Sequence, residues 1–153
     1  MNRFLDGLRY VFFAPEIVGL TLPLATYLYS PSLMDVLVRP MKDGIGFGLA
    51  AVAMPLVMLA FNYKESFDML SLSGTRKVLI EWPDYAALKG RVLAAFAWCV
   101  LGTLACMFAV WMVATDHAPQ LGVAIMLGGL LAAAIATATI GLARFALREI
   151  LGE

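Results

Sequence analysis

Four apolar stretches dominate the 153-residue chain, at residues 10–29, 44–62, 92–114 and 121–143. Each is about 20 residues long, the length that an α-helix needs to cross the hydrocarbon core of a bilayer. Backbone N–H and C=O groups inside lipid must be paired within the protein, so each stretch is expected to be helical. The sequence therefore predicts an all-α, polytopic membrane protein in which residues 1–153 form a single domain of four transmembrane helices.

The composition indicates that lipid covers much of this protein. Hydrophobic residues make up 62% of the chain and charged residues 14%, against about 45–50% and about 25% in soluble domains. A soluble fold of this size would not bury so much apolar surface. The formal net charge is zero, so no basic field favours nucleic acid. The expected partner is the lipid bilayer, and no nucleic-acid partner is expected.

The basic residues are distributed unevenly between the two sides of the predicted bundle. Of the 11 Lys and Arg residues, nine lie before the first stretch, in segment 63–91 or in the tail, and only Arg39 and Lys42 lie in segment 30–43. Loops rich in Lys and Arg stay on the cytoplasmic side. We therefore expect a multi-pass protein of the bacterial inner membrane with both termini and loop 63–91 in the cytoplasm. No cleavable signal peptide is evident, so the first span is interpreted as retained.

Glu16 is the ionisable residue inside the first stretch, directly after Pro15. A carboxylate within a membrane span is costly unless it faces protein, water or a charged partner. One interpretation is a proton- or cation-handling group that lines a pore. The other is a carboxyl that is protonated, or hydrogen-bonded to Thr or Tyr on a neighbouring helix, and serves packing alone. The sequence leaves both open.

Small residues recur at four-residue spacing in two of the stretches. Gly44 and Gly48 form such a pair at the start of 44–62, and Gly128 and Ala132 belong to a longer row in 121–143. Small residues at this spacing allow helices to approach closely. We expect 121–143 to lie between other helices and the chain to form a homo-oligomer. For Gly44 and Gly48, the alternative is that the glycines merely begin a helix.

The long polar segment 63–91 is expected to be a cytoplasmic loop, with a helical extension of the second span at its start. Its basic residues Arg76 and Lys77 would bind anionic headgroups or a cytoplasmic protein, or would simply set the orientation of the chain. Trp82 and Tyr85 flank Pro83 and suit the headgroup zone. These four residues are the site that the sequence predicts for docking a cytoplasmic protein or lipid headgroups.

No arrangement of residues typical of an enzyme, cofactor or metal site is found in the sequence. Nucleophile-elbow, zinc-protease and phosphate-loop motifs are missing, and Glu16 alone would not supply both an acid and a base. Cys99 and Cys106 are seven residues apart on one predicted helix, about 10 Å, which is too far for a disulfide. His117 has no companion ligand in the outer turn. We expect a protein that is not an enzyme and holds no cofactor or metal.

A layout of this kind has a known counterpart. The chain has a DGIG sequence at residues 43–46 before a span rich in small residues, a basic loop with Arg76 and Lys77, and a short turn between its last two spans. It resembles the small four-span inner-membrane protein of the lambda phage exclusion system, and more loosely other small four-span anti-phage proteins. That resemblance implies ion conduction and a role in phage defence. The 30–43 loop is longer here, and Glu16 has no counterpart.

Two functions from different classes follow. The first is an oligomeric ion channel or membrane-depolarising effector in which Glu16 lines a polar path. The second is an accessory or scaffold subunit of a membrane complex that docks a cytoplasmic protein through loop 63–91. The sequence supplies neither the ion nor the number of subunits.

Overall fold

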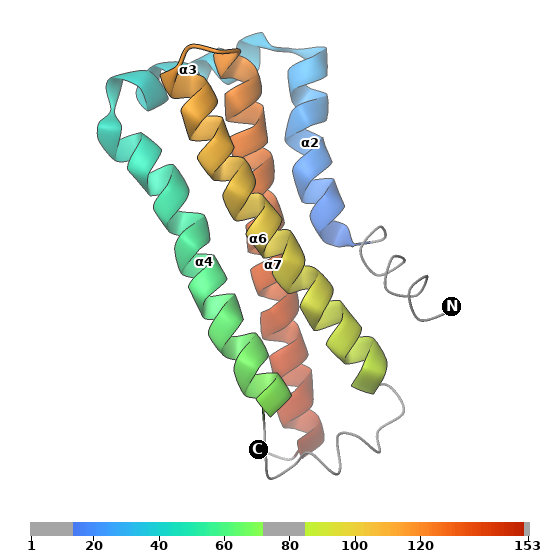
Figure 1. The fold of residues 1–153 in the computed structure, drawn as a ribbon. Helices are drawn as coiled ribbons and strands as arrows, with labels where there is room; N and C mark the ends of the chain where they lie inside the picture. The colour runs from blue at the N-terminus through green and yellow to red at the C-terminus, as the bar shows by residue number, and fades with distance from the viewer. Residues whose placement is uncertain (1–13, 72–84, 152–153) are drawn as a thin grey trace, which may run out of the picture.

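A computed structural model describes residues 14–71 and 85–151, and the described residues form helices without any strand. The helices are α2 (Pro15–Tyr29), α3 (Ser32–Asp43), α4 (Ile45–Ser71), α6 (Tyr85–Ala114) and α7 (Pro119–Leu151). Helices α2, α4, α6 and α7 run lengthwise, and α3 crosses one end of the bundle (Figure 1). We call this the α3 end. The opposite end, where α4 and α7 finish and α6 begins, is called the tail end.

Three helices are long and apolar enough to cross a membrane, namely α4, α6 and α7, and the count reaches four if α2 and α3 are taken as one bent span. Apart from Gly44, the three later apolar stretches of the sequence lie within these helices. Of the first stretch, residues 15–29 are helical and residues 10–13 lie outside the described part. The all-α fold with membrane-length helices is confirmed at this level, and the structure does not show on which side of a membrane the termini lie.

Helix α3 replaces the loop that the sequence predicts at residues 30–43. The axis turns by 110° between α2 and α3, and the Ser30 N–H closes the end of α2 on the Thr26 carbonyl. Helix α3 is amphipathic, because Met34, Val38 and Met41 recur at helical spacing and are buried. It therefore covers the end of the bundle with its apolar face.

Helix α7 is central and packs against every other described helix. A Cβ atom on Gly128 would lie 2.9 Å from the carbonyl oxygen of Leu20 in α2, and one on Gly19 would lie 3.1 Å from the amide nitrogen of Ala132. On another face of α7, a Cβ on Gly129 would lie 2.5 Å from the carbonyl oxygen of Gly102 in α6. The expectation that this helix lies between others, with Gly128 and Ala132 at a helix contact, agrees with this packing.

The proposed packing role of Gly44 and Gly48 is not met within this chain. Gly44 follows α3, and a Cβ there would meet the Pro40 carbonyl of the same chain segment at 3.0 Å. A Cβ on Gly48 would reach Val110 at 3.7 Å, an ordinary contact distance. Within one copy, these glycines lie where the chain turns from α3 into α4, and their role in packing against a second copy stays a prediction.

Segment 63–91 is much more helical than the predicted loop. Helix α4 continues to Ser71 and α6 begins at Tyr85, so a connection of residues 72–84 remains, which lies outside the described residues. The extension of α4 is helical because one of its faces is buried. Glu65, Ser66 and Met69 lie on that face and point into the bundle. The helical extension of the second span is confirmed, whereas the extent of the loop was wrong.

Two apolar clusters divide the bundle interior along its length. The α3-end cluster includes Met34, Val38, Ala109, Val113 and Met126, and it joins α3 to α6 and α7. The tail-end cluster joins α4, α6 and α7, and its buried members are Met69, Val92, Ala95, Cys99, Ala133, Ala136, Ile140 and Leu147.

The outside of the bundle is also apolar. On α6, for example, Leu101, Leu104, Phe108 and Trp111 are about half exposed. So many exposed large side chains on membrane-length helices indicate a surface made for lipid or for other copies of the chain.

Candidate functional site: buried charges between the helices

Glu16 lies in the first turn of α2 and is fully buried. An Arg91 Nη2 atom from α6 donates to both carboxylate oxygens, at 3.3 Å to Oε1 and 3.2 Å to Oε2. The Thr139 hydroxyl from α7 lies 3.3 Å from Oε1. The carboxylate therefore ties three helices together, and we call these three residues the Glu16 cluster.

The local sequence explains why Glu16 points inward. Pro15 occupies the first position of α2, where its missing N–H costs nothing. The next residue, Glu16, places a negative charge near the positive end of the helix dipole. Gly19, one turn later, lets α2 approach α7 closely, and this brings the carboxylate within reach of Thr139.

The sequence anticipated a threonine partner for Glu16 but not Arg91. The sequence feature that pointed to Arg91 is its position directly before the apolar stretch 92–114. Glu16 likewise lies near the beginning of the first stretch. Only the packing of α2 on α6 and α7 brings the two charges together. The structure thus describes a neutralised pair, with the Arg91 side chain 25% exposed and the Glu16 side chain not exposed at all.

A second buried ion pair lies nearer the tail end. Arg144 of α7 donates to the carboxylate of Glu65 in α4, whose side chain is 5% exposed. Glu65 was not a candidate in the sequence, although it lies in the predicted helical extension of the second span. Only the helical extension of α4 places it in the bundle.

An uncharged polar group lies deeper between α4, α6 and α7. Asn62 is fully buried, and its Nδ2 donates to the Cys99 sulfur at 3.2 Å and to the Thr137 hydroxyl at 3.0 Å. One turn away on α4, Ser66 is also buried. On α6, the Thr103 hydroxyl donates to the Cys99 carbonyl at 2.8 Å. Polar side chains thus continue from Glu65 and Arg144 to the middle of the bundle.

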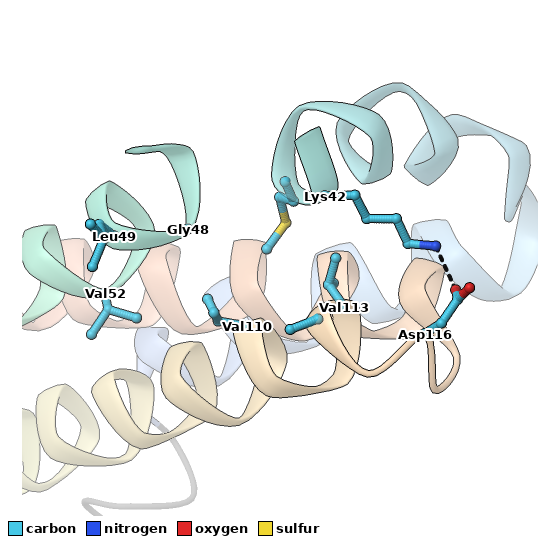
Figure 2. A pocket seen from close by; sticks show the side chains of 9 residues that line it. Lys42, Gly48, Leu49, Val52, Val110, Val113 and Asp116 are labelled. Atoms are coloured by element: carbon cyan, nitrogen blue, oxygen red, sulfur yellow. Dashed lines mark hydrogen bonds and ion pairs between the residues drawn. The ribbon is translucent and has the colours of Figure 1, made fainter. Parts of the chain in front are cut away.

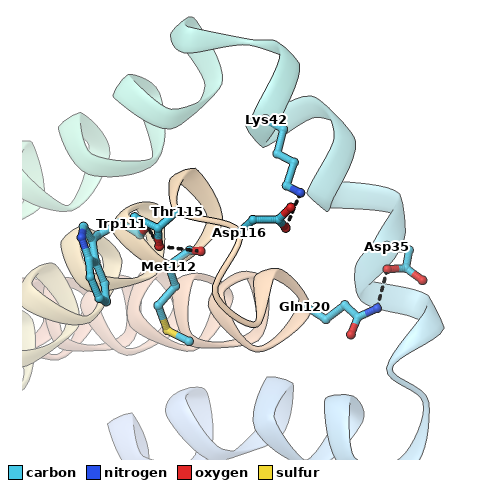
Figure 3. A network of polar contacts seen from close by, with 7 residues as sticks. All are labelled: Asp35, Lys42, Trp111, Met112, Thr115, Asp116 and Gln120. Atoms are coloured by element: carbon cyan, nitrogen blue, oxygen red, sulfur yellow. Dashed lines mark hydrogen bonds and ion pairs between the residues drawn. The ribbon is translucent and has the colours of Figure 1, made fainter.

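The α3 end has its own polar network, which is exposed. Lys42 and Asp116 form an ion pair at 2.5 Å, and Gln120 donates to Asp35 at 2.8 Å (Figure 3). Asp116 has a positive φ of 59° in the turn between α6 and α7. These contacts place segment 30–43 and turn 115–120 at the same end, as the predicted topology requires.

A groove opens beside this ion pair. It holds about 650 Å³ and runs between the start of α4 and the end of α6, with Lys42 and Asp116 at its rim (Figure 2). Val52, Val110 and Val113 make its wall apolar. On membrane-length helices such a groove suits an apolar chain, and nothing in the described residues selects a particular occupant.

The predicted docking residues are mostly beyond the described part of the chain. Arg76, Lys77 and Trp82 fall in 72–84. Tyr85 begins α6 and packs, half-buried, against the tail-end cluster. The scaffold function stays a prediction that now rests on residues 72–84.

The described residues contain no group of three or more His, Cys, Asp or Glu side chains placed to bind a metal ion. Cys99 and Cys106 are both buried and free. No protein-family model, curated protein or solved structure matches the chain. The function proposed below therefore rests on the buried charged residues.

Proposed function

We propose that this chain is a small oligomeric inner-membrane protein that conducts ions, and that it acts as a membrane-depolarising effector of an anti-phage system. The observation that carries the proposal is the Glu16 cluster, a fully buried carboxylate paired with Arg91 inside a bundle with membrane-length helices. Charged side chains at such depth commonly mark ion or proton pathways. The defence role comes from the resemblance to the phage exclusion protein.

Conduction would need more than one copy of the chain. The α3-end cluster fills the interior of the single bundle with apolar side chains. The exposed apolar residues of α4 and α6 offer a surface on which copies would meet. In this arrangement the Glu16 cluster holds α2 against α6 and α7, and loosening the pair would release a carboxylate into the ion path.

The test is ion flux into liposomes that contain the purified protein. The wild-type chain should pass monovalent cations, and Glu16→Gln should reduce or alter that flux several-fold, because the amide keeps the shape but not the charge. Asp116→Asn is the matched control, since it removes an exposed carboxylate at the α3 end. Ion-tight vesicles at high protein load would refute conduction, and unchanged flux in Glu16→Gln would exclude Glu16 from the path.

The orientation is a separate prediction. Reporter fusions after Glu153 and within 71–75 should give cytoplasmic signals, and a fusion at Asp116 should give an external signal. The expectation rests on the nine basic residues against two in the sequence. An external signal from the 71–75 fusion would overturn the topology and remove the cytoplasmic docking role of the segment.

A further inference from the structure

The amide of Asn62 has a defined orientation because of the groups around it. The Thr137 hydroxyl donates its single proton to the Ala133 carbonyl at 2.8 Å. It accepts from Asn62 Nδ2 at 3.0 Å, as suits a hydroxyl whose proton is donated elsewhere. The Oδ1 atom consequently points elsewhere, and among the described residues it has no hydrogen-bond partner.

A second unpaired polar atom lies one helical turn away. Ser66 is 8% exposed, and its Oγ likewise has no partner in the part of the chain that the structure describes. Residues four apart on a helix share a face, at about 6 Å along the axis. Asn62 Oδ1 and Ser66 Oγ thus belong to one buried polar patch on α4.

Among the described residues, no group compensates these two atoms. The neighbouring tail-end cluster consists of apolar side chains apart from the Cys99 thiol, which already accepts from Asn62. A buried amide oxygen without a partner destabilises the folded state. Water removes that cost, since buried waters typically bind otherwise unpaired polar groups. The Glu65–Arg144 pair, next along α4, supplies a polar connection toward the tail end.

Toward the α3 end, this patch is followed by apolar side chains. Seven residues further along α6, Cys106 is fully buried and lies in the α3-end cluster with Ala109, Val113 and Met126. Its sulfur lies 3.5 Å from the Met126 carbonyl. An apolar constriction of this kind excludes water.

We propose that the α4–α6–α7 interior is a one-sided hydrated vestibule in which water binds Asn62 Oδ1 and Ser66 Oγ. It connects through Glu65 and Arg144 to the tail end and is closed toward the α3 end by the apolar cluster. The vestibule is inferred only from the burial and the hydrogen bonding of these residues, so it does not depend on the proposed function.

The two native cysteines provide the test, because one lies in the vestibule and the other in the dry cluster. On transfer to D₂O, the infrared S–H band of the wild-type protein should decay in two phases, one for each thiol. Single-thiol variants assign them: Cys106→Ala retains the fast thiol and Cys99→Ala the slow one. We expect a rate difference of about tenfold or more, since exchange in a dry layer requires local opening.

A variant of the water-binding group completes the test. Asn62→Leu in the Cys106→Ala background should slow the exchange of Cys99 toward the rate of Cys106, and the milder Ser66→Ala should slow it less. Equally slow thiols in the wild type would show a dry interior, and equally fast thiols would show that the apolar cluster is no barrier. Either result overturns the vestibule. Ion flux does not enter the measurement, so failure of conduction is a separate outcome.

Discussion

Arg91→Leu should lower the stability of the purified protein by about 3–5 kcal/mol, the usual cost of leaving one member of a buried ion pair without its partner. Glu16 is fully buried, and among the described residues its partner besides Arg91 is the Thr139 hydroxyl, at 3.3 Å. A single hydroxyl does not compensate a carboxylate. Equilibrium unfolding in detergent measures the change.

The double variant Glu16→Leu with Arg91→Leu separates charge from packing. Replacing both members of a buried ion pair by apolar residues is often neutral or stabilising, so most of the lost stability should return. The coupling free energy follows from the two single variants and the double variant. A double variant as unstable as Arg91→Leu would show that the loss comes from the packing of Arg91 and not from the unpaired carboxylate.

Gly102→Ala should destabilise the contact between α6 and α7, although alanine favours helices over glycine by about 1 kcal/mol. The added Cβ would lie 2.6 Å from the carbonyl oxygen of Gly129, an atom of the backbone that no side-chain rotation can remove. The two helices must separate, and overpacking of this kind costs about 1–3 kcal/mol. The clash therefore exceeds the propensity gain, and the melting temperature should fall.

Gly141→Ala is the control for this substitution. Gly141 lies in α7, and a Cβ there would meet no atom within 4 Å. The helix propensity of alanine then acts alone, so the melting temperature should stay unchanged or rise. If Gly102→Ala melted as high as Gly141→Ala, the close approach of the two helices at Gly102 and Gly129 would be refuted.

The fold class was readable from the sequence because it depends on local properties. Apolar length predicts helices that suit a bilayer, and the small residues of 121–143 predict a helix packed on several sides. The loop boundaries were not readable. The helical extension of the second span was predicted, but the burial of Glu65 was not, because it depends on which face of the extension packs on α6 and α7.

Only part of the candidate site could be predicted from the sequence. Glu16 stood out because a carboxylate in an apolar stretch is costly wherever it lies. Its partner Arg91 comes 75 positions later, and no local pattern links the two. Asn62 and Ser66 gave no signal at all, since an amide or hydroxyl near the end of a span is common and becomes unusual only when buried without a partner.

By itself, the sequence determined that this protein is helical, apolar enough for a membrane and unusual at Glu16, because hydrophobicity and helix length are properties of neighbouring residues. The tertiary structure alone decided which charges meet and which polar atoms are left unpaired. Those depend on how far helices approach and how they are rotated about their axes. In this bundle the approach is set largely by the glycines of α2, α6 and α7, and it brings polar residues that are far apart in the sequence into contact between the helices.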